Sequence, residues 1–377
     1  MSEKRFDIVI FGATGFTGTL ICAYMASLCS SGLAVRWAMA GRSLEKLEAV
    51  RDRIGTGNTP LLVADASDPA AIAALVGATC IVISAAGPYH LYGTPLVAAC
   101  AQQGTDYIDL CGEPIWMRRM IDEYEAQAIR SGARIIFSCG FDSIPSELGV
   151  WLCQQEAQRR FGKPMPHVRG RVRTFTASPS GGSVASGMAT MKLATDHPEL
   201  AALLDNPYAL TPGFEGPAHP STANIEVDED VGRVGPFTLG PTDMKNVHRS
   251  NLLMDHPYGT DFIYDERLVD PPSVPPTLPS PDMLAKPGEG PSADQRAAGR
   301  FDLLFIGSDG QGNEVRVVVS GDDDPGYETS SRMVVETALC LLEHEEVKAG
   351  ILTPGAAFQQ ALLDRLSQRA GVNFKIA

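Results

Sequence analysis

The chain has 377 residues, more than one hydrophobic core usually supports, so we expect two domains. Its formal net charge of −14 argues against a nucleic-acid-binding protein, which needs a basic surface to neutralise phosphates. No apolar run reaches the length of about 18 residues that a membrane helix needs, and we expect no signal peptide. The eight cysteines include no CxxC pair, so we expect reduced thiols, no metal site and a cytoplasmic location.

Residues 1–150 alternate short apolar runs with helical stretches. The runs that predict strands are Asp7–Phe11, Arg36–Ala40, Leu61–Val63, Cys80–Ser84, Asp106–Asp109 and Arg134–Ser138. Helices are expected between them, at about 16–30, 43–54, 69–76, 93–103 and 115–131. Such alternation is typical of α/β proteins with a doubly wound parallel sheet, so we interpret residues 1–150 as a Rossmann domain.

Residues 151–377 have a different pattern. The predicted elements are helices at Gly149–Phe161, 183–195, 328–347 and 355–370, and strands at His167–Ala177, Phe301–Gly307, Glu314–Ser320 and Asn373–Ile376. The strands on either side of 308–313 predict a hairpin. Segment 206–300 holds more than half of the 27 prolines, which predicts a loop-rich or extended stretch with few long helices. We expect an α+β domain on a mainly antiparallel sheet, with the last helices packed back on the Rossmann domain.

A glycine-rich loop follows the first strand at once and leads into a helix, in the spacing Gly12-x-x-Gly15-x-x-Gly18. Gly12 permits a tight turn, Gly15 allows close approach to a pyrophosphate, and Gly18 lets the helix pack close to the strand. A pyrophosphate then lies at the helix N-terminus, where free N–H groups favour anions. The residues expected to bind the nucleotide are Gly12, Thr14, Gly15, Phe16, Thr17 and Gly18.

The end of the second strand indicates which dinucleotide is bound. An NAD-binding protein usually carries an acid there to hold the ribose hydroxyls, whereas this chain has Arg42 and Ser43. A guanidinium beside a hydroxyl suits the 2′-phosphate of NADP, so we predict NADP(H), the alternative being a solvated arginine. Asp65, after the third strand, is expected near the adenine or as a helix cap.

The carboxyl end of the fourth strand, in this fold, borders the nicotinamide ribose. Small residues and a proline there let a cofactor lie against the backbone, and they are Ala85, Ala86, Gly87 and Pro88. Phe141 follows the sixth strand and is expected at the same crevice.

Three sequence blocks resemble a known family: Gly87-Pro-Tyr-His-Leu-Tyr-Gly-Thr-Pro95, Tyr107-Ile-Asp-Leu-Cys-Gly-Glu113 and Gly140-Phe-Asp-Ser-Ile-Pro-Ser-Glu-Leu-Gly149. They are similar to the saccharopine dehydrogenase-like oxidoreductases, and within them to the branch of trans-acting enoyl reductases. The resemblance implies a Rossmann domain, an α+β domain of the saccharopine-reductase type and a reduced nicotinamide cofactor. Its enoyl reductase branch implies reduction of the C=C bond of a lipid-like or polyketide acyl substrate.

Two alternatives stay open for the activity. The first is an amino-acid C–N dehydrogenase of the saccharopine reductase type, although such enzymes need basic residues for substrate carboxylates. Here Asp142 is followed by Ser143, Ile144 and Pro145, and residues 178–190 are small and mostly uncharged. The second is a non-catalytic protein that binds NADP or associates with lipid.

Four residues are candidates for catalysis. Tyr89, His90 and Tyr92 follow the fourth strand, where a hydroxyl or an imidazole can polarise a carbonyl or donate a proton. Aromatic residues at this place also pack over the cofactor without reacting. Asp142 follows the sixth strand, at the edge where ligands bind, and is alternatively a helix cap.

The run from Ala157 to Thr195 contains no acid, and Arg169, Arg171 and Arg173 alternate along its strand. These guanidinium groups are expected either to attract an anion, such as a CoA phosphate or an acidic carrier protein, or to pair with the acids at 322–324. We further expect a hydrophobic acyl substrate and a homodimer formed through the second sheet. The amphipathic stretch 147–162 suggests peripheral membrane contact as an alternative to core packing.

Overall fold

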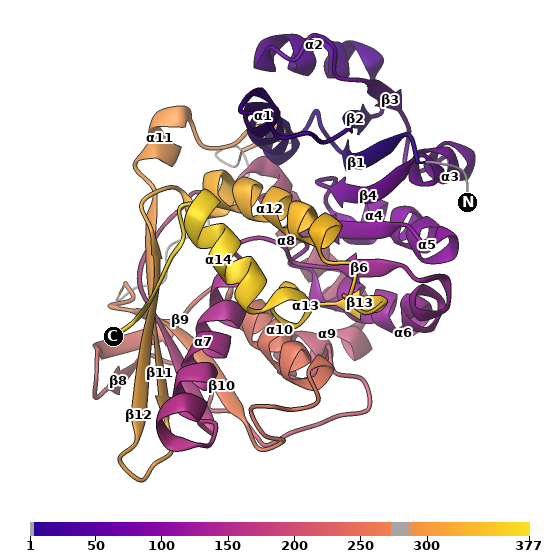
Figure 1. Cartoon of the computed structure of the whole chain (residues 1–377). Coiled ribbons are helices and arrows are strands. Elements are labelled where there is room, and N and C mark those ends of the chain that lie inside the picture. The colour runs from indigo at the N-terminus through magenta and orange to yellow at the C-terminus, as the bar shows by residue number, and fades with distance from the viewer. Residues whose placement is uncertain (1–3, 273–284, 287) are drawn as a thin grey trace.

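The computed structural model describes residues 4–272, 285–286 and 288–377, and their strands form two seven-stranded sheets (Figure 1). The first sheet is parallel and consists of β1 (Phe6–Phe11), β2 (Trp37–Gly41), β3 (Leu61–Val63), β4 (Thr79–Ser84), β5 (Asp106–Asp109), β6 (Arg134–Ile136) and β13 (Gly350–Leu352). Its order is β13-β6-β5-β4-β1-β2-β3, so the chain reverses direction across the sheet between β1 and β4. The predicted Rossmann architecture is confirmed, and its ligand crevice lies at that reversal.

The helices of this part connect its strands, as the alternation predicts. They are α1 (Phe16–Ser30), α2 (Leu44–Ile54), α3 (Pro69–Gly77), α4 (Tyr89–Tyr92), α5 (Thr94–Gln103) and α6 (Pro114–Ser131). The strands are mainly apolar in their interiors because helices cover both faces of the sheet, and Ile8, Val9 and Ile10 have no exposed surface. The strand β6 ends two residues earlier than expected, since Ser138 adopts a φ of 58° and turns the chain toward the crevice.

The second sheet is antiparallel except where β7 and β10 run parallel. Its strands are β7 (His167–Thr176), β8 (Glu226–Asp228), β9 (Gly232–Pro236), β10 (Ile263–Val269), β11 (Arg300–Ser308), β12 (Glu314–Gly321) and β14 (Asn373–Ile376). The predicted hairpin is present, with Ser308 opposite Glu314. Side chains alternate along β12, and Val315, Val317 and Val319 are fully buried. The mainly antiparallel α+β part is therefore confirmed.

The remaining helices are α7 (Ile144–Phe161), α8 (Gly181–Asp196), α9 (Pro198–Asp205), α10 (Gly240–Leu253), α11 (Ala293–Ala297), η2 (Pro325–Thr329), α12 (Ser330–Glu343), α13 (Pro354–Phe358) and α14 (Gln360–Arg369). The described residues of 206–300 are loop-rich with few long helices, as predicted, and the exception is α10, a 14-residue and largely buried helix. Pro241 lies in its first turn, where a proline costs no hydrogen bond, so the proline content concealed the helix. Residues 273–284 and 287 of this segment lie outside the described residues.

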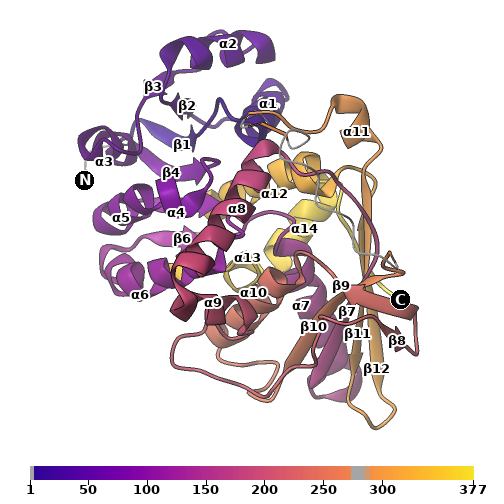
Figure 2. The same cartoon turned by 180° about the vertical axis from the view of Figure 1, so that it is seen from behind.

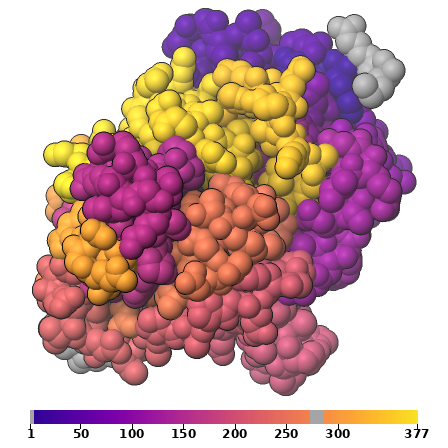
Figure 3. Space-filling view, turned by 60° about the horizontal axis from the view of Figure 1, so that its bottom comes forward, coloured from indigo at the N-terminus to yellow at the C-terminus, as the bar shows by residue number. Residues whose placement is uncertain are grey.

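The C-terminal segment returns to the first sheet. Its helix α12 packs against α1, and Tyr24 donates a hydrogen bond of 2.6 Å to Glu336. Figure 3 shows this segment, in yellow, against the indigo and purple N-terminal half. The strand β13 extends the sheet beside β6, a pairing that we did not predict because three residues show no periodicity. One continuous apolar core, which includes Ile8 and Val317, therefore joins the two sheets.

Figure 2 shows α8 running past the carboxyl edge of the first sheet. A Cβ atom on Gly87, just after β4, would lie 3.3 Å from the hydroxyl of Ser186, so α8 contacts the loop that follows β4. None of the helices in the described part of the chain combines the length and the apolar character that a membrane crossing requires.

Two histidines form a direct hydrogen bond inside the second part. The Nε2 atoms of His219 and His248 are 2.6 Å apart, and His219 Nδ1 lies 3.1 Å from the carbonyl oxygen of Pro217. His219 thus carries its proton on Nδ1 and accepts at Nε2. Burial lowers the pKa of both imidazoles, most strongly that of His248.

We expect this pair to make folding sensitive to acid. The unfolded chain binds protons at these histidines below their ordinary pKa of 6.5, while the folded chain binds them only at lower pH. The stability that the pair contributes is therefore present above pH 6.5 and lost as the pH falls through the lowered pKa values. Urea unfolding at pH 7.5 and 5 should show a smaller loss of stability at pH 5 for His248→Gln than for the wild type. An equal loss in both, with the exposed His197→Gln as control, would show that the pair does not titrate as argued.

Candidate active site

The glycine loop has the geometry that a bound dinucleotide requires. Gly12 has a φ of 83°, and a Cβ atom on it would lie 3.0 Å from the backbone of Ala85 and Ala86. A Cβ atom on Gly18 would lie 2.1 Å from the carbonyl oxygen of Gly12, so α1 packs directly on the loop. No acidic residue lies in the first turn of α1, which leaves its positive end available to an anion. The residues present therefore fit a dinucleotide at this crevice.

The second part of the chain covers Phe16, at the start of α1. The ring of Tyr327 packs edge-on against that of Phe16, with centroids 5.1 Å apart, and the Arg296 guanidinium lies 5.6 Å from the Phe16 centroid. The Tyr327 hydroxyl accepts a hydrogen bond from the Ser180 backbone and lies 2.9 Å from the Ser183 hydroxyl. The crevice is thus walled by both parts of the chain, which the sequence did not predict in detail.

The predicted 2′-phosphate residues lie after β2. The Arg42 side chain is exposed and makes no hydrogen bond or ion pair with the described residues. Ser43 caps α2 by accepting a hydrogen bond of 3.3 Å from the Lys46 backbone. Asp65 is not the cap of α3, since Asp68 has that place. Hydrogen bonds from Ser67, and to a smaller extent the Arg42 charge, lower the pKa of Asp65.

Replacing Arg42 tests the choice of cofactor. We expect Arg42→Ala to weaken NADPH binding by about 1.5–3 kcal/mol, the range for a charge-assisted contact, and to leave NADH binding unchanged. Titration with each nucleotide, followed by quenching of protein fluorescence, measures both. Arg130→Ala removes one exposed charge from the far end of α6 and is the matched control. Equal weakening of NADPH binding and NADH binding would show that the guanidinium does not contact the 2′-phosphate.

The loop after β4 is held by a buried acid. Backbone N–H groups of Tyr89 and His90 donate to the two carboxylate oxygens of Glu113, at 2.8 and 3.0 Å. The imidazole Nδ1 of His90 lies 2.9 Å from the same carboxylate, and the side chain is 16% exposed. Glu113 thus fixes the orientation of His90. The other ring nitrogen of His90, Nε2, takes no part in this contact. No motif of the sequence indicated this role for Glu113.

The two tyrosines of this loop differ in environment. Tyr89 is buried, donates to the Ser84 carbonyl at 3.1 Å and accepts from the Leu110 backbone at 3.2 Å. Both hydrogen-bonding functions of its hydroxyl are therefore used to hold β4 and β5 together. Tyr92 is 43% exposed, at the outer end of α4.

Asp142 lies after β6, beside the loop that carries Glu113. Its carboxylate would be 3.0 Å from a Cβ atom on Gly112, and it accepts no hydrogen bond from the described residues. Burial raises the pKa of Asp142 to about 6. The expected alternative, a helix cap, is not observed, because α7 begins without a side-chain cap. Phe141 packs under the second sheet, with its ring 5.4 Å from that of Phe175.

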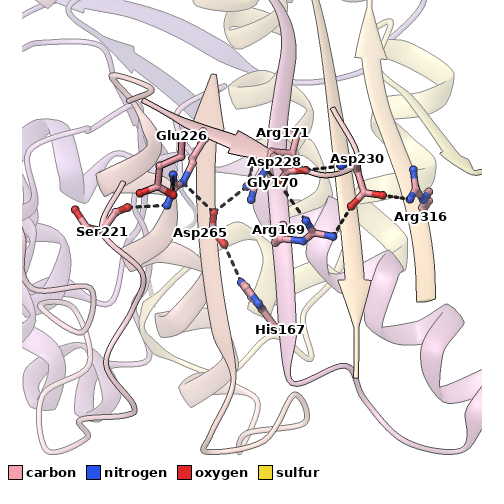
Figure 4. Close-up of polar contacts among 11 residues, drawn as sticks. His167, Arg169, Gly170, Arg171, Ser221, Glu226, Asp228, Asp230, Asp265 and Arg316 are labelled. Atoms are coloured by element: carbon pink, nitrogen blue, oxygen red, sulfur yellow. Dashed lines mark hydrogen bonds and ion pairs between the residues drawn. The ribbon is translucent and has the colours of Figure 1, made fainter. Parts of the chain in front are cut away.

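The arginines of β7 pair with acids that the sequence analysis did not name (Figure 4). Arg169 contacts Asp228 and Asp230, and Arg171 contacts Asp228 and Asp265, at 2.6–3.1 Å. Arg173 pairs with Asp302 at 2.6 Å. The expected pairing with 322–324 is wrong, because the β8–β9 hairpin folds over this face of the sheet. These guanidinium groups are neutralised, so they do not form the anion-attracting surface that was the other expectation.

Comparison with known proteins agrees with this architecture. Residues 8–136 match the family model described as the saccharopine dehydrogenase NADP binding domain. A provisionally named trans-acting enoyl reductase of Mycobacterium tuberculosis is 36% identical, and the alignment covers 99% of this chain and 98% of the relative. The trans-acting enoyl reductase of Mycobacterium ulcerans is 33% identical, with 97% of each chain covered.

The fold is also found among solved structures. The apo saccharopine dehydrogenase (L-Glu forming) from Saccharomyces cerevisiae superposes with a TM-score of 0.56 at 11% identity, over 99% of this chain and 100% of that one. The family model covers the glycine loop and the first sheet as far as β6, and the relatives align with nearly the whole chain. The chain therefore belongs to the saccharopine dehydrogenase-like family, with the trans-acting enoyl reductases, and is an NADP-dependent oxidoreductase.

Proposed function

We propose that the protein uses NADPH to reduce the C=C bond of an unsaturated, lipid-like or polyketide acyl substrate. The observation that carries this proposal is an aromatic cluster beside the carboxyl end of β6. Half-buried Phe175 lies 5.4 Å from Phe141 and 5.2 Å from Phe237, measured between ring centroids, and these two rings are buried behind it. The apolar character of this place favours an acyl chain over a charged amino acid.

The polar groups near this cluster disfavour an amino-dicarboxylate. A substrate carboxylate needs a cationic partner, and the arginines of β7 are paired with Asp228, Asp230, Asp265 and Asp302. On β10, Arg267 is likewise held by Glu226 at 2.9 Å. These two strands therefore offer no free cation to a substrate carboxylate, which the alternative C–N dehydrogenase would need. We propose two domains, in which residues 1–150 bind the cofactor and residues 151–377 bind the acyl group.

Exposed apolar side chains support entry of a long chain near the loop after β4. Leu91 and Tyr92 on α4 are 57% and 43% exposed, and Met188 and Met191 on α8 are 64% and 63% exposed. The two helices approach each other where Ser186 contacts Gly87. We propose that the acyl substrate arrives on CoA or on a carrier protein and enters between them. A homodimer, peripheral membrane contact and a cytoplasmic location also remain predictions.

The reduction needs a hydride and a proton. NADPH supplies the hydride when it is bound at the glycine loop. The chain must supply a proton at the α-carbon and exclude water from the crevice. Asp142 is our candidate proton donor, because burial favours the protonated carboxyl and no described residue donates to it. We assign His90, which Glu113 holds, the role of polarising the thioester carbonyl, with Tyr92 as the outer candidate. We assign Tyr89 a structural role, since its hydroxyl is already used.

A substrate panel tests this proposal. The purified protein and NADPH are mixed with 2-enoyl thioesters of increasing chain length and, separately, with 2-oxo acids plus amino acids. We expect NADPH absorbance to fall only with the enoyl thioesters, and faster as the chain lengthens. Consumption only with the oxo-acid mixtures would overturn the proposal in favour of C–N chemistry.

A further inference from the structure

Two buried carboxyl groups of the second part lie where α10 packs on β10. Asp243 on α10 and Glu266 on β10 are each 1% exposed, and a Cβ atom on Gly240, one turn before Asp243, would lie 3.7 Å from that of Glu266. Two neighbouring carboxylates buried in this way do not both ionise, so one of them holds a proton. Ser146 on α7, with its hydroxyl 3.2 Å from both oxygens of Glu266, fixes the second carboxyl.

Polar atoms around this pair lack partners. Asn246 follows Asp243 by one helical turn and is fully buried, yet neither its amide nitrogen nor its oxygen bonds to a described residue. The Oδ1 atom of Asp243 is buried and likewise without a partner among the residues that the structure describes. Buried polar groups are nearly always hydrogen-bonded, so these atoms point to an exchangeable partner rather than to a closed structural network.

Glu147, a neighbouring buried acid, is different. Its carboxylate accepts hydrogen bonds from the hydroxyls of Ser143 and Ser250 and from the Gly355 backbone at 2.9 Å. Those contacts join α7, α10 and the start of α13, a purely structural arrangement. The contrast marks the pair formed by Asp243 and Glu266 as the group with unused hydrogen-bonding capacity.

The pair lies beside the start of α7, which follows Asp142 in the chain. Ser146, whose hydroxyl contacts Glu266 at 3.2 Å, comes four residues after Asp142, and α10 packs against both α7 and β10. Burial and mutual repulsion raise the pKa of both Asp243 and Glu266, and the Arg171 charge opposes the rise at Glu266. The titratable and charged groups that face the pair are Asp142, Glu147, Arg171 and Tyr264.

We propose that Asp243 and Glu266 form the proton store of the active site, which re-protonates Asp142 after each reduction. This inference rests on the proposed function. The O–H bond of the Asp142 carboxyl breaks as a C–H bond forms at the α-carbon, and the O–H electron pair remains on the carboxylate. The pair then gives Asp142 one proton, and solvent restores it. Asp243 and Glu266 are thus positioning residues that act through Asp142.

Infrared spectroscopy on the unliganded protein tests the store without substrate. We expect the C=O stretch of a protonated carboxyl at pH 7.5, with part of this band missing in Asp243→Asn and in Glu266→Gln. Activity gives a second readout with an enoyl thioester found in the substrate panel. Both variants should lower kcat by about 100-fold, the lower range for proton-transfer catalysis, while KM stays within about threefold. The alkaline limb of the kcat profile should move to lower pH, because Asp142 alone then holds the proton. Asp243→Glu should restore part of kcat.

The control is Glu147→Gln, which should lower the unfolding temperature and keep the pH profile. A wild-type spectrum in which neither variant removes any protonated-carboxyl intensity would overturn the proton store. So would variants whose pH profile matches that of the wild type. Failure of every enoyl thioester would instead overturn the proposed function, and the infrared titration would still decide whether the pair holds a proton.

Discussion

Gly18→Ala should abolish measurable NADPH binding at concentrations that saturate the wild type. The added methyl group would lie 2.1 Å from the Gly12 carbonyl oxygen, a backbone atom that moves only if the loop and α1 separate. Overpacking of this kind costs about 1–3 kcal/mol, and here the displaced atoms are those that form the phosphate site. Isothermal titration with NADPH measures the loss, and circular dichroism reports whether the fold is kept.

Gly57→Ala is the matched control. Gly57 has no atom within 4 Å of an added Cβ and lies in the loop before β3. Its variant should bind NADPH as the wild type does. Normal NADPH affinity in Gly18→Ala would show that the close contact between α1 and the loop is not needed for the cofactor.

Arg171→Ala should destabilise the second sheet by about 1.5–3 kcal/mol, because it removes charge-assisted hydrogen bonds from two buried acids, which then keep Arg169 and His167 as their nearest basic partners. The Arg171 side chain is 4% exposed, and its two acids, Asp228 and Asp265, are 4% and 2% exposed. The loss should appear in urea unfolding at neutral pH as a lower midpoint with an unchanged slope.

Arg173, on the same strand, provides the comparison. Its side chain is 38% exposed and that of Asp302 is 34% exposed, so Arg173→Ala should cost only about 0–1 kcal/mol. Similar losses for the two variants would contradict the conclusion that burial decides the importance of these ion pairs.

The parts of the fold that follow from local sequence were predictable. The seven residues from Gly12 to Gly18 are enough to determine the conformation of the loop. The structure shows the expected turn and the close contact with the helix. The alternation along β12 likewise places Val315, Val317 and Val319 in the core. In each case the constraint acts between residues that are near one another in the chain.

The features that were missed depend on distant segments. The strand β13 exists because β6 offers it an open edge, and nothing in its three residues indicates this. Arg171 pairs with Asp228 because the β8–β9 hairpin folds over β7. Asp243 and Glu266 meet only because α10 packs on β10, and neither residue lies in a recognisable motif. Such contacts need the tertiary arrangement.

Tracing the hydride tests the central claim most directly. NADPH carrying deuterium at C4 of the nicotinamide is incubated with the protein and a 2-enoyl thioester, and the product is analysed by mass spectrometry and NMR. The account predicts a saturated thioester with one deuterium at the β-carbon and a solvent-derived hydrogen at the α-carbon. Deuterium at a carbon bonded to nitrogen, found only with amino-acid imines, would contradict it and identify a C–N dehydrogenase.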